Sequence, residues 1–233
     1  MKDSFEEQHD GLNTPFYDAS TNSIQWIDLK TWDRKRLFYN YLGTDFPYII
    51  LTTNVDVTNP LAFAHANGVS FNLVMVYLCN KTADSIINYR YRFIDGKPFL
   101  IDHTRPTVNH IKKGEELFVI GEGPWPCDDI LEFCRKCHKN QENATLEDQE
   151  RRVRHKLDII NYTSLPWVEY TGFIRTIAHN GEDNAPKISF GRYFERDGRV
   201  LMPISSQTHH GLMDGYHVGQ FFQKLQAACD DLK

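Results

Sequence analysis

The sequence predicts an α/β fold, because strand-like and helical runs share one chain. Residues 47–57 are rich in β-branched and aromatic side chains, and residues 200–206 form a second apolar run of strand length. Residues 70–88 present a broad apolar surface at helical spacing, and an amphipathic run covers residues 218–232. Together these four runs are typical of an α/β protein.

A chain of 233 residues can enclose one or two cores, and we expect one domain over residues 24–233 after a polar extension of residues 1–23. The net charge of −5 argues against nucleic acid as a partner. No apolar run has the length of a membrane helix. The first nine residues are acidic and polar, unlike a signal peptide, so we expect a cytoplasmic protein.

The five cysteines also favour free thiols, because an odd number without a secretion signal rarely forms a disulfide framework. Cys134 and Cys137 have the spacing of a metal-binding or redox pair. The sequence has no second such pair at ligand spacing. We therefore interpret them as thiols on a helix over residues 128–138 and expect no metal.

The first half of the chain gives further elements in order. Residues 24–29 alternate like a strand, and residues 32–41 read as a helix with Thr31 as its N-cap and Gly43 after its end. A short helix is expected over residues 59–67. A hairpin follows the long helix, with strands at 91–94 and 99–101 around the turn Asp95-Gly96.

The second half of the chain is also predicted to contain both strands and helices. We expect a strand over residues 116–120, the helix over residues 128–138 and a charged, solvated run over residues 140–156. Residues 173–177 show a strand pattern. The turn Asp197-Gly198 then returns the chain into the strand at residues 200–206.

The most informative stretch is Thr208–His217, whose core reads His-His-x-x-x-Asp-Gly between a strand and a helix. Side chains at such an element end are fixed but reachable. Histidine has an ordinary pKa that suits proton transfer near neutral pH. We predict His210 as a general base, because it precedes Asp214 by four residues. His209 is expected on the opposite face, and His217 is expected to be structural.

This stretch resembles the signature His-His-x-x-x-Asp-Gly-Phe-His of the chloramphenicol acetyltransferase family, and the likeness runs from about residue 24 to the C-terminus. The resemblance implies a mixed β-sheet flanked by helices, a two-layer α/β sandwich, in a homotrimer with active sites between subunits. Lipoyl-dependent relatives would have Arg instead of the second His and would carry extra domains. Condensation domains would need about twice this length to enclose two halves of the fold.

The resemblance also assigns residues to the chemistry. Arg34, in Trp32-Asp33-Arg34-Lys35, matches a family arginine that pairs with the motif aspartate, here Asp214. Such a pair would tie the His210 turn to the body of the protein. Thr163, three residues before Pro166-Trp167, stands where the family has a serine that stabilises the tetrahedral intermediate, and a threonine hydroxyl can donate the same bond.

Acetyl-CoA is the co-substrate that the resemblance implies. Ser189 matches a family threonine that holds a water near the intermediate. Arg192 and Tyr193 match residues that meet the phosphate and adenine ends of coenzyme A, and Trp167 is assigned to the same ligand. The sequence has no glycine-rich phosphate loop, so side chains would have to hold the nucleotide.

The acceptor pocket is where the chain departs from the family. Tyr41 and Phe173 keep its aromatic character, but Arg175 falls where the family is aliphatic and is expected to line the pocket. Polar side chains in an apolar pocket are costly unless the acceptor pairs with them. The other departures are Lys187 for an aliphatic residue, Glu150-Arg151 for a Phe-Pro pair, and Val69 for a lysine.

The sequence therefore predicts an acetyl-CoA-dependent O-acetyltransferase that inactivates chloramphenicol by direct transfer, with His210 as the base. One alternative is a related CoA-dependent acyltransferase for a more polar alcohol or amine. The other is a non-catalytic trimeric ligand-binding protein of the same fold. A binding protein would have no need of a base beside an oxyanion donor.

Overall fold

The computed structural model describes residues 22–147, 157–177 and 183–233. Glu150, Arg151 and nearly all of the expected extension lie outside these residues, so the boundary after residue 23 stays a prediction. The helices are α2 (Lys35–Leu42), α3 (Thr58–Asn67), α4 (Phe71–Asp84), α5 (Ile130–Asn143) and α7 (Gly215–Asp231), with a 3-10 turn at Ile87–Arg90. None of the helices in these three ranges is long and apolar enough to cross a membrane.

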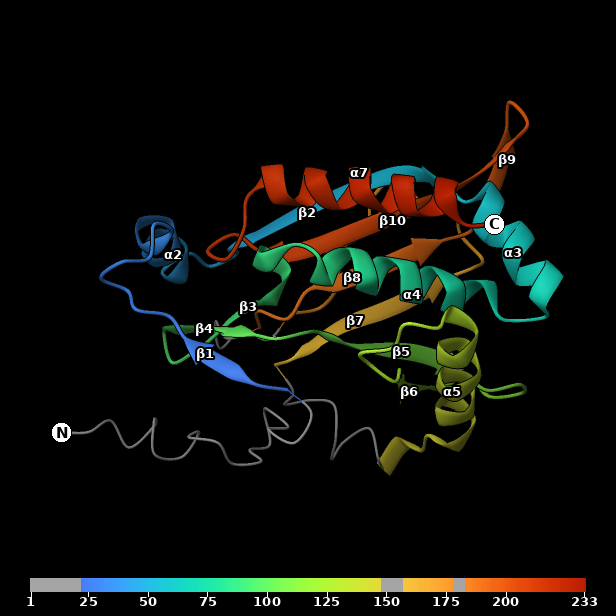
Figure 1. Cartoon of the computed structure of the whole chain (residues 1–233), viewed down its shortest axis with the longest axis horizontal. Helices are drawn as coiled ribbons and strands as arrows, with labels where there is room; N and C mark the ends of the chain where they lie inside the picture. Colours follow the sequence, from blue (N-terminus) through green and yellow to red (C-terminus); the bar gives the residue numbers. More distant parts are fainter. Residues whose placement is uncertain (1–21, 148–156, 178–182) are drawn as a thin grey trace.

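Two sheets form the body of the protein (Figure 1). The small sheet has the order β1-β4-β3, and the large sheet has the order β2-β10-β8-β7-β5-β6, with β9 paired to β10. Strand β7 runs parallel to β5 and β8, and the other pairs are antiparallel, which confirms the mixed sheet. The strands are β1 (Ile24–Trp26), β2 (Tyr48–Asp56), β3 (Tyr91–Ile94), β4 (Lys97–Ile101), β5 (Arg105–Ile111), β6 (Phe118–Glu122), β7 (Ile159–Leu165), β8 (Lys187–Gly191), β9 (Phe194–Arg196) and β10 (Arg199–His209).

Helices α4 and α7 cover one face of the large sheet, and α5 lies beside α4 (Figure 1). Because the sheet and two helices surround α4, all eight residues from Leu73 to Asn80 are buried. The opposite face of the sheet is covered by irregular chain: the Tyr170 hydroxyl donates to the Ser189 carbonyl, and the Arg175 N–H donates to the Gln207 side chain. Strand β10 is consequently buried on both faces from Met202 to His209.

The structure confirms most of the expected elements and corrects three. Thr31 does not cap α2, which begins at Lys35; the Thr31 hydroxyl donates instead to the Asp28 carbonyl in the preceding turn. The long helix ends at Asp84, four residues short of the prediction, and a 3-10 turn follows. Residues 173–177 form no strand. Strands β5, β7 and β8 were not predicted.

Cys134 and Cys137 are buried on α5 and form no disulfide with another described cysteine. Burial raises the pKa of Cys134 to about 11 and that of Cys137 to about 12. Both are therefore protonated near neutral pH and poorly reactive. Asp129 caps this helix by accepting from the N–H groups of Leu131 and Glu132.

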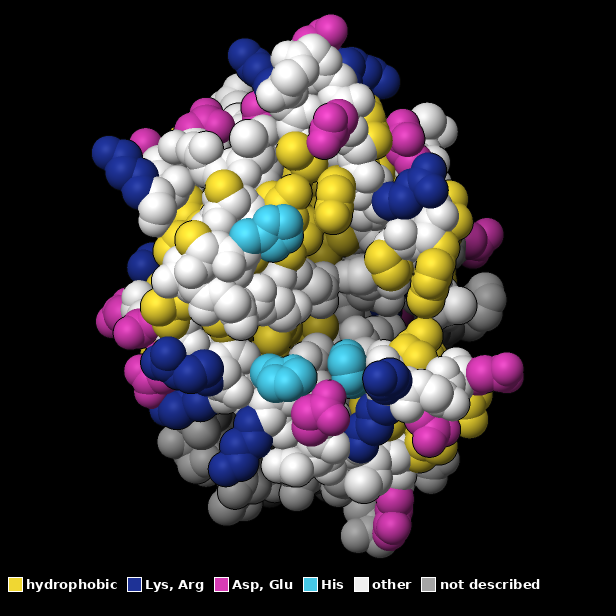
Figure 2. Space-filling model, turned by 90° about the vertical axis from the view of Figure 1, so that its right-hand side faces the viewer, with side chains coloured by type: hydrophobic (Ala, Val, Ile, Leu, Met, Phe, Trp, Pro, Cys, Tyr) yellow, Lys and Arg dark blue, Asp and Glu magenta, His cyan; other side chains and the backbone are white. Residues whose placement is uncertain are grey.

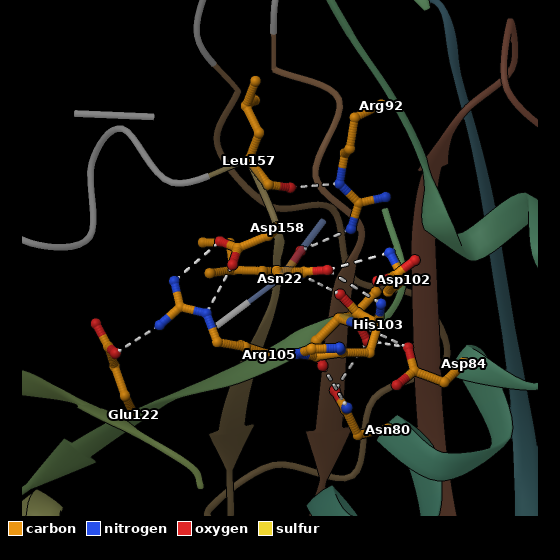
Figure 3. Close-up of polar contacts among 12 residues, drawn as sticks. Asn22, Asn80, Asp84, Arg92, Asp102, His103, Arg105, Glu122, Leu157 and Asp158 are labelled. Atoms are coloured by element: carbon orange, nitrogen blue, oxygen red, sulfur yellow. Dashed lines mark hydrogen bonds and ion pairs between the residues drawn. The ribbon is translucent and has the colours of Figure 1, made fainter. Parts of the chain in front are cut away.

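A buried polar network ties the start of β5 to the start of β7 (Figure 3). The Arg105 guanidinium binds both oxygens of Asp158 at 2.7 and 2.9 Å and one oxygen of Glu122 at 3.0 Å. Asp158 has no exposed side-chain surface. The fully buried Arg92 donates to four backbone carbonyls nearby, including Leu157 and Ile159, and burial lowers its pKa to about 10.

Replacing Arg105 by Met should destabilise the fold by about 3–5 kcal/mol, because a fully buried carboxylate would lose its bidentate partner. Urea unfolding at pH 7 measures the loss. Lys136→Met removes a cation from an exposed pair with Glu132 and should leave the midpoint unchanged. Equal midpoints for the two variants would show that the Arg105–Asp158 pair does not support the fold.

Candidate active site

His210 lies at the point where β10 gives way to the turn before α7, and two contacts fix its ring. The Nδ1 atom lies 3.2 Å from the Met213 carbonyl oxygen. Because a carbonyl only accepts hydrogen bonds, Nδ1 carries the proton of the neutral ring, and Nε2 is left with a free lone pair. The Tyr41 ring stacks on the imidazole at 3.9 Å and 11°. The side chain is 28% exposed, so a ligand can reach it.

Arg34 binds the other end of the same turn. Its guanidinium makes a bidentate pair with the Asp214 carboxylate at 2.7 and 2.8 Å. It also donates to the carbonyl oxygens of Gly211 and His210 at 3.0 and 3.1 Å. These bonds hold the Asp214 pKa below its usual value. The predicted pairing of Arg34 and Asp214 is therefore present, and we call His210, Asp214, Arg34 and Tyr41 the histidine corner.

His209 points away from this corner, as the strand alternation predicts. It is buried beside the rings of Phe93 and Tyr48. Its Nδ1 accepts the Gly211 N–H at 3.1 Å, and burial lowers its pKa to about 4. A Cβ at Gly211 would lie 3.0 Å from the His209 ring, so a larger residue here would crowd the buried imidazole. His209 is therefore a neutral packing residue near pH 7.

His217 has a local structural contact. Its Nδ1 accepts the N–H of Asp214 at 3.0 Å across the first turn of α7. Burial lowers its pKa, so the ring accepts this bond as a neutral group. The contact stabilises the start of the helix.

Thr163 and Ser189 belong to a second group, a row of hydroxyl side chains on the large sheet. Thr163 on β7 lies opposite Ser189 on β8, which lies opposite Ser205 on β10. The Ser205 hydroxyl shares a 2.6 Å hydrogen bond with Thr52 on β2. We call these four residues the hydroxyl row. It faces away from the helices, because the preceding residue of each inner strand lies in the core beneath them: Tyr162, Ile188 and Ile204.

The hydroxyl row and the histidine corner are far apart within one chain. Thr163 lies two strands from Ser205, and His210 lies five residues beyond Ser205 along β10. Strand geometry makes this separation about 10 Å across the sheet and about 16 Å along it. One chain therefore does not bring the Thr163 hydroxyl within hydrogen-bonding reach of the atoms that contact His210.

A third group lies at the far end of the sheet, where β7 and β8 finish. Trp167 is 66% exposed and Tyr193 is 44% exposed, with the Tyr193 ring packed edge-on against Phe71 at 5.6 Å. Arg192 is exposed, and its N–H donates to the Val168 carbonyl. Both strands end on the side of the molecule shown in Figure 2, which is hollowed near its centre and has hydrophobic side chains around the hollow. We call this group the open end.

Phe173 and Arg175 lie on the irregular segment over the polar face of the sheet. The Arg175 side chain donates to the Asn161 carbonyl at 2.9 Å, and its backbone N–H binds Gln207. Burial lowers the Arg175 pKa to about 10. Lys187 pairs with Asp183 at 2.5 Å, and burial lowers its pKa as well. Lys187 on β8 lies opposite Asn161 on β7 and Gln207 on β10, which are the two residues that Arg175 contacts. Arg175 and Lys187 therefore lie on the same polar surface of the sheet.

Sequence reasoning missed Asn109, whose side chain donates to the Thr163 hydroxyl at 3.3 Å. The sequence signal for strand β5, which carries Asn109, was weak because polar and apolar residues alternate only in part of it and because it contains a proline. Among the described residues, no group of three or more His, Cys, Asp or Glu side chains could hold a metal ion.

Comparison with known proteins agrees with this arrangement. A family model described as chloramphenicol acetyltransferase matches residues 22–226. Chloramphenicol acetyltransferase 2 of Haemophilus influenzae is 31% identical over 210 residues, which cover 88% of this chain and 97% of the relative. Chloramphenicol acetyltransferase 2 of Escherichia coli is 29% identical over 211 residues, with the same coverage. A solved chloramphenicol acetyltransferase structure matches with a TM-score of 0.81 at 26% identity, covering 91% of this chain and 100% of that chain.

Arg34→Met should lower the free energy of unfolding by about 2 kcal/mol at pH 7, because it strands the half-buried Asp214 carboxylate and two turn carbonyls. The Asp214 pKa is lower in the folded state than in the unfolded chain, so this stabilisation is present above about pH 4 and is lost as the pH falls through the folded pKa.

Urea unfolding of wild type and Arg34→Met at pH 7 and pH 3 measures the size of the loss and its dependence on pH. The difference in free energy of unfolding between the two proteins should be smaller at pH 3 than at pH 7. Arg36→Met, at an exposed position of the same helix, is the matched control and should behave as wild type at both values. A difference that stays constant between pH 7 and pH 3 would contradict the role of Asp214 as the charged partner.

Proposed function

This chain belongs to the chloramphenicol acetyltransferase family, and from that premise we propose that it transfers the acetyl group of acetyl-CoA to a hydroxyl of chloramphenicol. The observation that carries the proposal is the state of His210: its Nδ1 is committed to the Met213 carbonyl, its ring is stacked on Tyr41, and its Nε2 lone pair is free. A base in this tautomer and orientation is what proton abstraction from an alcohol requires.

His210 Nε2 takes the proton of the acceptor hydroxyl as the oxygen attacks the thioester carbonyl. A C–O bond forms, and the carbonyl electron pair moves onto the oxygen, which the Thr163 hydroxyl stabilises. Collapse of this intermediate re-forms the carbonyl and breaks the C–S bond. The imidazolium returns its proton to the departing CoA thiolate, so His210 is regenerated without an acyl-enzyme. Arg34 and Asp214 keep the turn fixed during both proton transfers.

The site requires a second copy of the chain. Thr163 lies too far from His210 in one chain to act on the same carbonyl, so the Thr163 that serves one His210 must come from a neighbour. A closed homotrimer meets this requirement, because each chain gives its histidine corner to one neighbour and its hydroxyl row to the other. The family resemblance supports the same assembly, with three equivalent sites between subunits.

The open end suits the nucleotide portion of acetyl-CoA. Arg192 offers a cation for a phosphate, and the exposed rings of Tyr193 and Trp167 offer faces on which a purine can stack. Ser189 lies between Thr163 and Ser205 in the hydroxyl row, where its side chain can hold a water beside the intermediate. The cofactor would then extend along the sheet from the open end to the hydroxyl row.

A second candidate function is acetylation of a more polar acceptor, and Arg175 is the observation that favours it. Its guanidinium is half-buried beside the hydroxyl row. Among the described residues, the side chain uses one of its five N–H donors, in the hydrogen bond to the Asn161 carbonyl. An acceptor with a carboxylate, phosphate or several hydroxyls would satisfy the remaining donors. The non-catalytic ligand-binding alternative gains no support from a histidine held in one tautomer.

His210→Ala should lower kcat by about 10²–10⁴-fold, because the proton acceptor is lost while the binding surfaces remain. The measurement is thiol release from acetyl-CoA with chloramphenicol and, separately, with polar alcohols and amines. His217→Asn preserves an acceptor near the Asp214 N–H and is the matched control, with less than a tenfold change. A loss below tenfold for His210→Ala would rule out His210 as the base. Turnover with a polar acceptor alone would favour the second candidate.

Coexpression of His210→Ala and Thr163→Val chains should give more activity than either variant has alone. A site built from two chains is intact when its histidine comes from one variant and its threonine from the other, which random mixing in a trimer gives at about a quarter of the sites. Differently tagged chains allow the mixed trimers to be purified before assay. Mixed trimers no more active than either parent would contradict a site shared between subunits.

A further inference from the structure

We propose that Asn109 is a positioning residue for Thr163: its amide N–H holds the Thr163 hydroxyl so that the hydroxyl proton faces the reacting carbonyl, and its amide oxygen binds a donor group of the substrate. The juxtaposition that carries the proposal is the 3.3 Å hydrogen bond from Asn109 Nδ2 to Thr163 Oγ1 between neighbouring strands. It rests on the proposed function, in which Thr163 donates to the oxyanion.

The register of the sheet places the two side chains together. Val108 on β5 lies opposite Tyr162 on β7 in a parallel pair, and both belong to the core under the helices. The next residue on each strand, Asn109 and Thr163, therefore points to the face away from the helices. Both are half-buried, so each keeps some access from that face.

The hydrogen-bonding capacity of a hydroxyl makes the identity of residue 109 important. A threonine hydroxyl has one proton to give and two lone pairs. The Asn109 N–H occupies one lone pair, so the O–H bond must point elsewhere. Within the described ranges Asn109 supplies the one side-chain hydrogen bond of Thr163, and the proton stays available for an incoming oxyanion. An acceptor at this position would instead consume that proton.

The amide oxygen of Asn109 gives an independent indication of a ligand. Asn109 Oδ1 is buried and has no hydrogen-bond partner among the described residues. A buried acceptor without a partner is costly, and folded proteins usually satisfy it. A substrate hydroxyl or amide N–H, arriving beside Thr163, supplies the missing donor. The chemical class required of the bound group is therefore a hydrogen-bond donor close to the reacting carbonyl.

A double-mutant cycle tests the proposal with the full-length protein and the thiol-release assay. Asn109→Ala should lower kcat about tenfold, and Thr163→Val about a hundredfold. In the Thr163→Val background, Asn109→Ala should lower kcat no further, because the hydroxyl that it positions is gone. The KM for the acceptor should rise in both backgrounds, because the contact of the amide oxygen with the substrate is lost in each. In Asn109→Asp the side chain keeps its shape, but a carboxylate only accepts hydrogen bonds and would take the Thr163 hydroxyl proton. This variant should therefore lower kcat as far as Thr163→Val does.

Asn161→Ala is the matched control. Asn161 lies on the same strand and face as Thr163. Its amide oxygen is also buried without a hydrogen-bond partner in the part of the chain that the structure describes, and no hydrogen bond joins it to the Thr163 hydroxyl there. Asn161→Ala should change kcat by the same factor whether residue 163 is threonine or valine. Melting temperatures accompany each variant, and if Asn109→Ala does not fold, Asn109→Asp in the two backgrounds decides the matter.

Three outcomes would overturn the role of Asn109: wild-type kcat in Asn109→Ala, the same fold loss in both Thr163 backgrounds, or wild-type kcat in Thr163→Val. The first two outcomes leave the proposed function intact as long as wild type turns over and His210→Ala does not. The third would also remove Thr163 from the proposed mechanism, while acetyl transfer with His210 as the base would stand. A wild-type protein that releases no thiol with any acceptor contradicts the proposed function itself. The two failures are therefore distinguishable in one set of assays.

Discussion

The ion pair between Arg34 and Asp214 is the interaction on which the histidine corner depends. It joins two positions 180 residues apart and brings the start of α2 against the turn between β10 and α7. The same guanidinium binds the carbonyls of His210 and Gly211, so one side chain fixes the backbone on both sides of the turn. The His210 ring direction follows from that backbone, because its Nδ1 bonds to the Met213 carbonyl.

Packing beneath the corner keeps Arg34 in place. Phe38 on α2 is fully buried and packs against Phe93 of the small sheet at 5.4 Å and against Leu212 of the turn. Gly211 lies close to the Phe38 ring as well. Helix α2 is too short to be stable alone. Its position therefore depends on this aromatic cluster, which links the small sheet to the candidate site.

Within the histidine corner, the role of His210 was predicted from the local motif, whereas the pairing of Arg34 with Asp214, 180 residues away, was expected from the family resemblance. The motif Thr208–His217 and the run that contains Arg34 each lie within one stretch of sequence, and the structure places both as expected. Asn109 was not predictable in this way, because its role depends on which strand lies beside β5. That pairing joins residues more than 50 positions apart, and no local pattern specifies it. The strand predicted at residues 173–177 was wrong: this segment contacts the sheet through the backbone N–H and the side chain of Arg175 and does not join it as a strand.

Topology decides how the separate groups can form one site. Strand β10 runs antiparallel to β8, so the motif at its C-terminal end lies at the opposite end of the sheet from Trp167 and Tyr193 (Figure 1). A longer motif or a different turn would not bring the motif close to Trp167 and Tyr193, because the strands that lead to these residues are buried and hydrogen-bonded over their length. In the proposed homotrimer, the histidine corner of one chain would face the hydroxyl row of a second chain, which would bring base and donor to one substrate without altering either fold. A closed ring of such contacts leaves no corner without a hydroxyl row, which favours a cyclic assembly over a single chain.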